Sequence, residues 1–305
     1  YFHLWNVKRM RPKALGPFDY DNENYTNLLF VSEGFTAYYE DLIVFRSGFY
    51  SKEEFLQKVA SSFSYSDNQL GALIQPLNEA SFDAWIKYYR PNENSNNSTV
   101  SYYSKGAAVA GALDMIIRTK TLGKKSLDDV MQVLYQTYFL GYNRGFSDQE
   151  FQDAVTQIAG VDMNPFFKQF VYNTQKIPFD SIAQDMGFDL IDNFADEEKV
   201  YIGLNVNNTK NTVTSVERNS PAWQSGVNVG DEIIAINDVR FNGDLSAGLN
   251  GVKINQEINL LLSRNGIVKQ VKLKVANTPY VNYFLEASAS PSEQQKKIIK
   301  SWLGE

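Results

Sequence analysis

The chain has a single histidine, His3, and this limits the chemistry that its 305 residues can perform. No Ser-His-Asp triad or other histidine-based arrangement can be completed away from that position. There is no cysteine, which excludes disulfide bridges, thiolate metal sites and cysteine nucleophiles. A lone histidine is usually structural or exposed, so the role of His3 has to be judged from its sequence context.

The sequence around His3 fits the end of a zinc-binding motif. In a His-Glu-x-x-His peptidase, two histidines one helical turn apart bind zinc from one face of a helix. A carboxylate from a later helix completes three protein ligands and leaves one position open for water. Tyr1, Phe2 and His3 would form the last three positions of such a motif. The first histidine and the general-base glutamate are then expected just upstream of residue 1.

Helix signals that can position this motif run through residues 1 to about 180. Residues 27–45 form a long, mainly apolar stretch that ends before Gly48, a glycine suited to a helix C-cap. Further helix starts are indicated by capping boxes or a first-turn proline. They lie at Ser51, Ser126, Ser147 and Asn164-Pro165.

Three shorter segments of this half carry their own predictions. Residues 106–112 are small, which predicts a helix over 101–118 that packs closely on its neighbours. Asp114 and Arg118 stand four residues apart, the spacing of an ion pair on a helix surface. Residues 92–98 are polar and rich in asparagine, which predicts a mobile surface loop.

From about residue 199 the pattern changes to short β-type runs separated by Gly, Asn and Asp. The expected strands are residues 200–206, 212–216, 232–236, 257–262 and 268–275. Asn265-Gly266 between the last two predicts a type I′ hairpin, because that turn needs a positive φ at both positions. Residues 292–303 predict a short amphipathic helix. We therefore expect a helical domain over 1–185, a β-rich domain over 186–280 and a C-terminal tail over 281–305.

Residues 220–237 are similar to the PDZ signature of bacterial proteases, with glycines that fit tight turns and Asp231 before an apolar strand. PDZ domains bind a peptide by strand addition and capture its C-terminal carboxylate in a nest of backbone amides. We place that nest at Ile202, Gly203 and Leu204, where the glycine allows close backbone approach. In the alternative interpretation the groove is blocked and the domain is only structural.

Six segments match one known family in order: residues 1–39, 79–85, 101–106, 113–118, 126–131 and 294–304. On these segments the chain resembles the glycyl aminopeptidase family, gluzincin metallopeptidases with a C-terminal PDZ domain. The resemblance implies that His3 is the second zinc ligand and Glu33 the third. Tyr103 matches the tyrosine of the Tyr-x-Lys-Gly motif in the related aminopeptidase N family. That tyrosine donates a hydrogen bond to the developing oxyanion.

Each of these residues also has a simpler interpretation. Glu33 would otherwise be an ordinary carboxylate on a helix surface, and Tyr103 is one of eighteen tyrosines. Asp83 and Trp85 either line a substrate pocket or pack helices together. Lys105 either pairs with a carboxylate or extends its ammonium group to solvent.

The patterns predict a mainly α-helical part followed by a small β-rich domain, and the resemblance implies that these are a thermolysin-like catalytic part and a PDZ domain. We expect the complete protein to be a zinc metallopeptidase, an aminopeptidase acting on small N-terminal residues as the resemblance implies. Zinc would activate a bound water and polarise the scissile carbonyl. Without the first ligand and the general base, this chain alone is expected to hold zinc weakly and to be inactive. The alternative is a non-catalytic PDZ-type module for peptide binding or scaffolding.

The composition restricts the partners. A net charge of -6 argues against a nucleic-acid binder, which needs a basic face to neutralise phosphates. No apolar run reaches the length of a transmembrane helix. We therefore expect a peptide substrate, and a peptide C-terminus as a ligand of the PDZ groove.

Overall fold

The computed structural model describes residues 1–304, which form two compact units. The first, called here the helical unit, consists of Tyr1–Arg90, Thr99–Asn193 and the segment that begins at Val281. The second, called the β unit, consists of Pro91–Ser98 and Phe194–Tyr280. Each unit encloses its own apolar core, as the predicted fold class requires. None of the helices within residues 1–304 has the length and apolar character to cross a membrane.

The helical unit is built around α5 (Ser104–Lys120), which is buried along most of its length. The other helices and turns of this unit are η1 (Phe2–Leu4), η2 (Lys13–Leu15), η3 (Phe30–Gly34), α1 (Phe35–Arg46), α2 (Lys52–Asn68), η4 (Leu70–Leu73), α3 (Leu77–Phe82), α6 (Leu127–Val133), η5 (Leu134–Gly141), α7 (Asp148–Ala159), α8 (Asn164–Phe170), α9 (Phe179–Met186) and α12 (Glu293–Leu303). Two strands complete the unit, β1 (Phe188–Asp192) and β10 (Tyr283–Ala287).

Glycines allow η3 to lie directly against the start of α5. A Cβ atom added to Gly34 would lie 2.5 Å from the Cα atom of Gly106 and 2.8 Å from the carbonyl oxygen of Tyr102. No side chain fits in that space, so the close approach requires glycine. The prediction that residues 106–112 pack closely on a neighbour is confirmed, and the contact holds η3 next to the first turn of α5.

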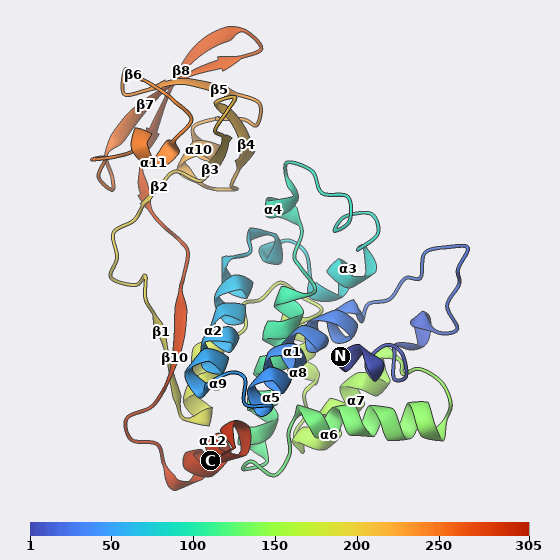
Figure 1. Cartoon of the computed structure of the whole chain (residues 1–305). Coiled ribbons are helices and arrows are strands. Elements are labelled where there is room, and N and C mark those ends of the chain that lie inside the picture. Colours follow the sequence, from blue (N-terminus) through green and yellow to red (C-terminus); the bar gives the residue numbers. More distant parts are fainter. Residues whose placement is uncertain (305) are drawn as a thin grey trace. The chain divides into compact units, whose positions relative to one another are not determined.

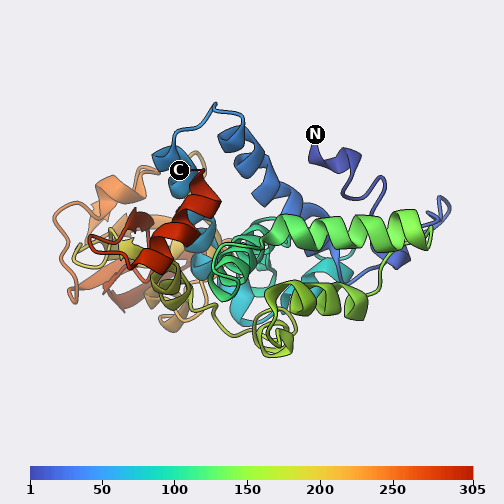
Figure 2. The same cartoon turned by 90° about the horizontal axis from the view of Figure 1, so that it is seen from below.

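Local capping signals set most helix starts where the sequence placed them. The side chains of Ser51 and Ser147 each accept a hydrogen bond from the backbone amide three residues later. At Ser126 the backbone amide donates to the Asp129 carboxylate at 2.9 Å. The helix that starts there is long, because α6 continues directly into the π-helical segment η5, as the green ribbon in Figure 2 shows.

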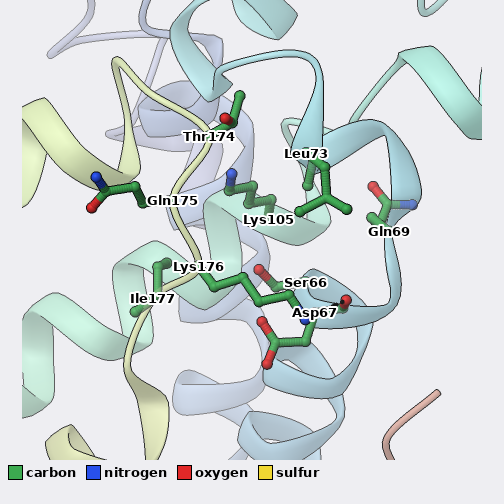
Figure 3. A pocket seen from close by; sticks show the side chains of 10 residues that line it. Ser66, Asp67, Gln69, Leu73, Lys105, Thr174, Gln175, Lys176 and Ile177 are labelled. Atoms are coloured by element: carbon green, nitrogen blue, oxygen red, sulfur yellow. Dashed lines mark hydrogen bonds between the residues drawn. The ribbon is translucent and has the colours of Figure 1, made fainter. Parts of the chain in front are cut away.

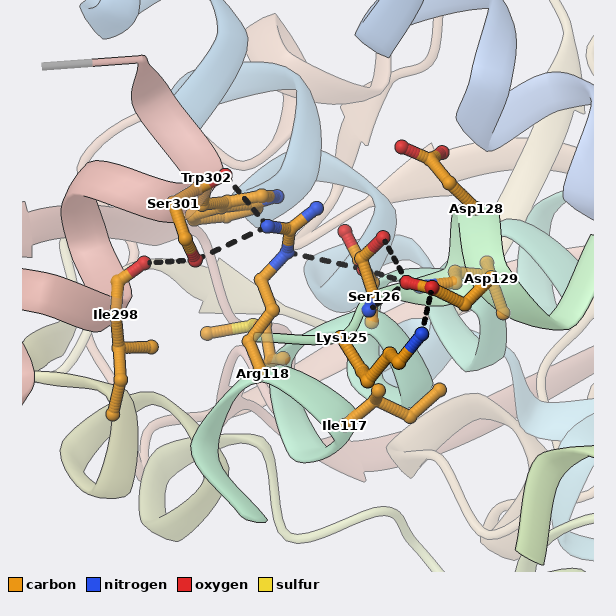
Figure 4. A network of polar contacts seen from close by, with 12 residues as sticks. Ile117, Arg118, Lys125, Ser126, Asp128, Asp129, Ile298, Ser301 and Trp302 are labelled. Atoms are coloured by element: carbon orange, nitrogen blue, oxygen red, sulfur yellow. Dashed lines mark hydrogen bonds and ion pairs between the residues drawn. The ribbon is translucent and has the colours of Figure 1, made fainter. Parts of the chain in front are cut away.

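The Asp114–Arg118 pair is buried, so the prediction of an ion pair on the helix surface was wrong. The two side chains are only 1% and 4% exposed. Arg118 Nε donates to Asp114 Oδ1 at 3.1 Å, and its Nη1 donates to the carbonyl of Ser301 at 2.7 Å (Figure 4). Asp114 also accepts from the Tyr38 hydroxyl at 2.7 Å and from the Leu127 amide at 2.8 Å. The pair is buried because α1 and α12 cover this part of α5.

The C-terminal segment returns to the helical unit. β10 pairs antiparallel with β1 over its whole length, with Leu285 opposite Leu190. Figure 1 shows the two strands running side by side. α12 then contacts α5 and α9 and buries Trp302, which confirms the helix predicted for residues 292–303. The compact units therefore divide after Asn193, because β1 has its partner in β10.

The β unit contains an antiparallel sheet in the order β3-β4-β5-β7-β8. Its strands are β3 (Leu204–Asn207), β4 (Thr212–Val216), β5 (Glu232–Ile236), β7 (Glu257–Arg264) and β8 (Ile267–Lys274), with β6 (Val239–Arg240) beside β5. β2 (Val200–Tyr201) pairs separately with β9 (Ala276–Asn277), and two short helices are present, α10 (Pro221–Gln224) and α11 (Leu245–Gly248).

The predicted strands are confirmed, with one break. Asn265 and Gly266 join β7 to β8 with φ values of +53° and +80°, as a type I′ hairpin requires. The first expected strand, residues 200–206, is interrupted at Ile202 and Gly203, which separate β2 from β3. This break leaves backbone groups free of the sheet at the edge next to β3.

Residues 91–98 belong to the β unit, although the segments on either side of them belong to the helical unit. They contain a one-turn helix, α4 (Ser95–Ser98). Asn97 is 2% exposed; its Nδ2 donates to the Val216 carbonyl at 2.8 Å, and its Oδ1 accepts from the Arg218 amide at 2.8 Å. The prediction of a mobile surface loop was therefore wrong for Asn97, whose partners are far away in the sequence.

Candidate functional site

His3 and Glu33 face each other in the helical unit. The Nε2 atom of His3 lies 3.3 Å from Oε2 of Glu33. His3 is carried by η1 and Glu33 by η3, so two short helical turns supply the pair. Their side chains are 43% and 25% exposed, which leaves both within reach of a solute. The structure therefore brings together the two residues predicted to bind zinc.

The geometry of the pair fits two ligands of a zinc site. Nδ1 of His3 lies 3.1 Å from the backbone oxygen of Asn6. An Nδ1–H group that donates to this carbonyl leaves the lone pair of Nε2 directed at Glu33, as in metal-binding histidines. Two ligands at about 2.0–2.1 Å from a tetrahedral zinc lie roughly 3.3–3.4 Å apart, which matches the observed separation. In the described part of the chain, no group of three or more His, Asp or Glu side chains is placed to hold a metal ion.

Asn6 anchors the segment that carries His3, and the sequence analysis missed it. The residue is fully buried, and its Nδ2 donates to the carbonyls of Val31 and Ser32 at 2.9 and 3.0 Å. Asn6 thus holds η1 against η3 through its side chain and contacts the His3 ring through its backbone oxygen. The one signal in the sequence was its position three residues after the histidine, within reach of the ring.

Glu33 lies on a π-helical turn. The segment η3 has π geometry and continues without a break into α1. Such turns are frequent at functional sites, since they redirect a side chain within an otherwise regular helix. Phe30 and Val31 are at most 1% exposed, whereas the Glu33 side chain reaches the surface on the side of His3. The buried neighbours fix the turn, and the turn directs the carboxylate.

Tyr103 precedes α5, next to the contact between Gly34 and Gly106. Its hydroxyl lies 3.5 Å from that of Tyr89, which lies 2.8 Å from the hydroxyl of the buried Tyr102. Burial raises the pKa of Tyr103 well above its usual range, and Tyr89 and the negative charge of Glu33 raise it further. The phenol is therefore protonated at neutral pH and is a hydrogen-bond donor near Glu33.

Asp83 and Trp85 differ in their exposure and contacts. Asp83 forms an ion pair with Lys87 four residues later, so its carboxylate is engaged locally. Trp85 is 44% exposed, and its ring centroid lies 6.2 Å from that of Tyr89. Of the two, Trp85 offers an apolar surface beside Tyr89, which in turn lies next to Tyr102 and Tyr103.

Lys105 lies in a small cavity and follows neither predicted alternative. Its side chain is 3% exposed, so the ammonium group does not reach solvent. The cavity is lined by Asp67 and Thr174 among others, and the ammonium group points toward its Thr174 end (Figure 3). Burial lowers the pKa of Lys105 to about 8, and Asp67 only partly opposes this effect. No ion pair to Lys105 is found among residues 1–304.

In the β unit, a groove of about 420 Å³ lies between the β2–β3 segment and α11. Ile202, Gly203 and Leu204, the predicted carboxylate nest, all line it. Gly203 has a φ of +73°, and its carbonyl accepts a hydrogen bond from the Glu217 amide at 2.8 Å. Among residues 1–304 no hydrogen bond from the amides of Ile202 or Gly203 is found, so both remain available to a ligand.

Comparisons with known proteins match both halves of the chain. Residues 1–109 match the family model of the M61 glycyl aminopeptidase, and residues 200–275 match that of the PDZ domain. Among curated proteins, no sequence matches.

Among solved structures, the chain is similar to that of an aminopeptidase N family protein from Idiomarina loihiensis. The TM-score is 0.86 and the sequence identity 27%, over 99% of this chain and 53% of that chain. This chain thus spans about half the length of that protein. Two further matches cover 27% of this chain and 30% of theirs: an HtrA-type protease AlgW with decapeptide (19% identity, TM-score 0.25) and a serine endoprotease from Yersinia pestis (26% identity, TM-score 0.24).

Proposed function

Because the chain contains an M61 glycyl aminopeptidase segment followed by a PDZ domain, we propose that it contributes to a zinc-dependent peptidase. His3 and Glu33 are the proposed zinc ligands, and Tyr103 is the proposed oxyanion donor. The observation that carries this proposal is the 3.3 Å approach of His3 Nε2 to Glu33 Oε2. An imidazole and a carboxylate are ligand types that catalytic zinc sites use.

The residues around the pair prepare it for this role. The Asn6 carbonyl orients the His3 ring so that Nε2 faces Glu33, and the Asn6 side chain fixes the spacing of the two segments. Zinc, when bound, supplies an activated water and polarises the scissile carbonyl. Tyr103 keeps its proton because of its raised pKa, so its hydroxyl can donate to the oxygen on which negative charge develops.

The proposed substrate is a peptide with a small residue at its free N-terminus, as the glycyl aminopeptidase match supports. A catalytic zinc site needs three protein ligands, and the described residues offer two. We therefore propose that a further ligand and a general base come from outside residues 1–304. Residues 1–305 alone would then bind zinc weakly and hydrolyse no peptide.

The groove of the β unit supports a second activity, peptide binding. β3 is the end strand of its sheet, so its outer edge can pair with an added strand. The amides of Ile202, Gly203 and Leu204 are proposed to hold the C-terminal carboxylate of the peptide. The blocked groove considered above is not favoured, because the space next to these residues is large enough for side chains of a ligand.

The peptidase proposal is tested with the full-length protein and glycyl and alanyl amides as substrates. Tyr103→Phe is expected to lower kcat by about a hundredfold, the usual effect of removing one oxyanion donor, with bound zinc unchanged. Tyr65→Phe, an exposed tyrosine on α2, is the matched control and should leave kcat unaltered. A Tyr103→Phe enzyme with the wild-type kcat would contradict the assigned role.

A further inference from the structure

The groove of the β unit contains one charged side chain, that of Glu217. The residues that line it are otherwise apolar or uncharged, and none is a lysine, an arginine or a histidine. A site that only captured a peptide carboxylate would gain from a cation, and this groove has an acid instead. The negative charge of Glu217 therefore restricts which charged groups a ligand can place in the groove.

Glu217 lies at the end of the groove formed by the proposed carboxylate nest. Its backbone amide donates to the Gly203 carbonyl, and its side chain accepts a hydrogen bond from the Tyr201 hydroxyl. That hydroxyl is also next to the loop, because a Cβ atom added to Gly203 would lie 2.7 Å from it. The carboxylate of Glu217 is thus fixed beside the amides that would meet the end of a peptide.

Two tyrosine hydroxyls, those of Tyr201 and Tyr280, interact with this carboxylate. Burial raises the pKa of Tyr201 well above its usual range, and the bond to Glu217 raises it further. Burial and the same carboxylate also raise the pKa of Tyr280, which lines the groove as well. Both phenols stay protonated at neutral pH and act as donors rather than as additional charges.

No cation of the described chain neutralises Glu217. The residue is 9% exposed, and no Lys, Arg or His side chain within residues 1–304 forms an ion pair with it. The adjacent Arg218 forms no ion pair with Glu217 among the described residues, and its buried Nε has no hydrogen-bond partner. A carboxylate taken this far out of water is stabilised strongly by a cation that arrives with a ligand.

We infer that the groove selects peptides that present a cationic group to Glu217, and that it rejects peptides with an acidic side chain there. This inference rests on the proposed peptide binding and specifies its ligand. The cation is supplied by a lysine or arginine near the C-terminus, or by a free N-terminal ammonium group. A free terminal carboxylate bound at the nest brings a second negative charge next to Glu217, so such a peptide depends most on the cation.

The test uses the 305-residue chain and short fluorescent peptides of alanine and valine that differ at one position near the C-terminus. Lysine, methionine or glutamate occupies that position, and each peptide is made as a free acid and as an amide. A further arm leaves the N-terminus free instead of acetylated. Fluorescence anisotropy gives Kd for each.

The lysine peptide is expected to bind about tenfold more tightly than the methionine peptide, the usual gain from a charge-assisted hydrogen bond. The glutamate peptide should bind more weakly than both. Glu217→Gln keeps the shape of the side chain and should remove the difference between lysine and methionine. Glu232→Gln removes an exposed acid of β5 outside the groove and is the matched control.

The possible results separate this inference from the peptide-binding proposal on which it rests. Equal affinities for the lysine, methionine and glutamate peptides in the wild-type chain would overturn the role of Glu217 and leave peptide binding intact. A lysine preference that persists in Glu217→Gln would overturn it too. Failure of every peptide to bind would contradict peptide binding itself and the inference with it. Preference for a free N-terminus over an internal lysine would identify the ammonium of the terminus as the cation source.

Discussion

Replacing Lys105 by methionine is expected to stabilise the protein at neutral pH. Lys105 is 3% exposed, and burial lowers its pKa to about 8. At roughly 1.4 kcal/mol per pH unit, the distance from the ordinary lysine value of about 10.4 corresponds to a penalty of about 3 kcal/mol for burying the charge. Methionine has a similar length and no charge, so Lys105→Met should recover most of that free energy of unfolding.

The pH dependence gives the sharper test. Between pH 8 and about 10.4 the unfolded chain binds the proton of this lysine while the folded chain has released it. The wild-type protein therefore gains stability relative to Lys105→Met as the pH rises through this window. The advantage of the variant should be about 2–3 kcal/mol at pH 7 and close to zero above pH 10.

Urea unfolding of the wild-type protein and of Lys105→Met at pH 7 and pH 10 measures this difference. The contributions of all other titrating groups cancel, because both proteins contain them. Lys176→Met changes an exposed lysine of the same cavity and should alter the free energy of unfolding by less than about 0.5 kcal/mol. The reasoning is refuted if Lys105→Met destabilises the protein at pH 7, or if its effect does not change with pH.

Three further perturbations test the fold around the site. Gly34→Ala should destabilise the protein by about 3 kcal/mol or more in urea unfolding, since its Cβ meets the backbone of α5; a near-neutral effect would refute the close contact. Arg118→Met leaves the buried Asp114 carboxylate without its cation, so the free energy of unfolding should fall by about 3–5 kcal/mol. The double variant Arg118→Met with Asp114→Asn should lose less. The Arg144 guanidinium lowers the pKa of Glu150 to about 2, so the pair stabilises the fold above about pH 4.3 and that contribution is lost as the pH falls toward 2. Because the two side chains are 37% and 28% exposed, solvent screens the pair, and Arg144→Gln should lose less than about 1 kcal/mol at pH 7 and nothing near pH 2; a constant difference would contradict this.

Features governed by neighbouring residues could be predicted from the sequence. The capping serines need only a partner three residues away, and the Asn265-Gly266 turn needs only two positive φ values. The strands were predicted from short β-type runs between Gly, Asn and Asp, which are also local signals. Capping and turn energies are local, so they do not depend on how the rest of the chain folds.

Features governed by distant partners could not be predicted. Asn97 is in a polar segment, and only Val216 and Arg218 explain why it is buried. Arg118 has the spacing of a surface pair, but α12 covers it. Glu217 belongs to no recognisable sequence motif, and its proposed role rests on its position among the residues that line the groove. Burial of a polar side chain depends on tertiary packing, which hydrophobic periodicity and secondary-structure propensity do not specify.

Of the candidate site, the residues alone pointed to His3, the only histidine, and the resemblance supplied Glu33 and Tyr103. Their proximity is a property of the fold, since the Asn6 side chain and the Gly34–Gly106 contact bring the three segments together. The small residues 106–112 predicted the second of these supports, whereas no motif predicted the burial of Asn6.

The most direct test of the account is the zinc affinity of the chain and of two variants, measured by competition with a chromogenic chelator. His3 is the only histidine and there is no cysteine, so few other strong ligands are available. His3→Ala and Glu33→Gln should each lower the affinity by more than about tenfold, and Glu40→Gln, an exposed acid on α1, should not. Unchanged zinc binding in both His3→Ala and Glu33→Gln would contradict the assignment of these residues as zinc ligands.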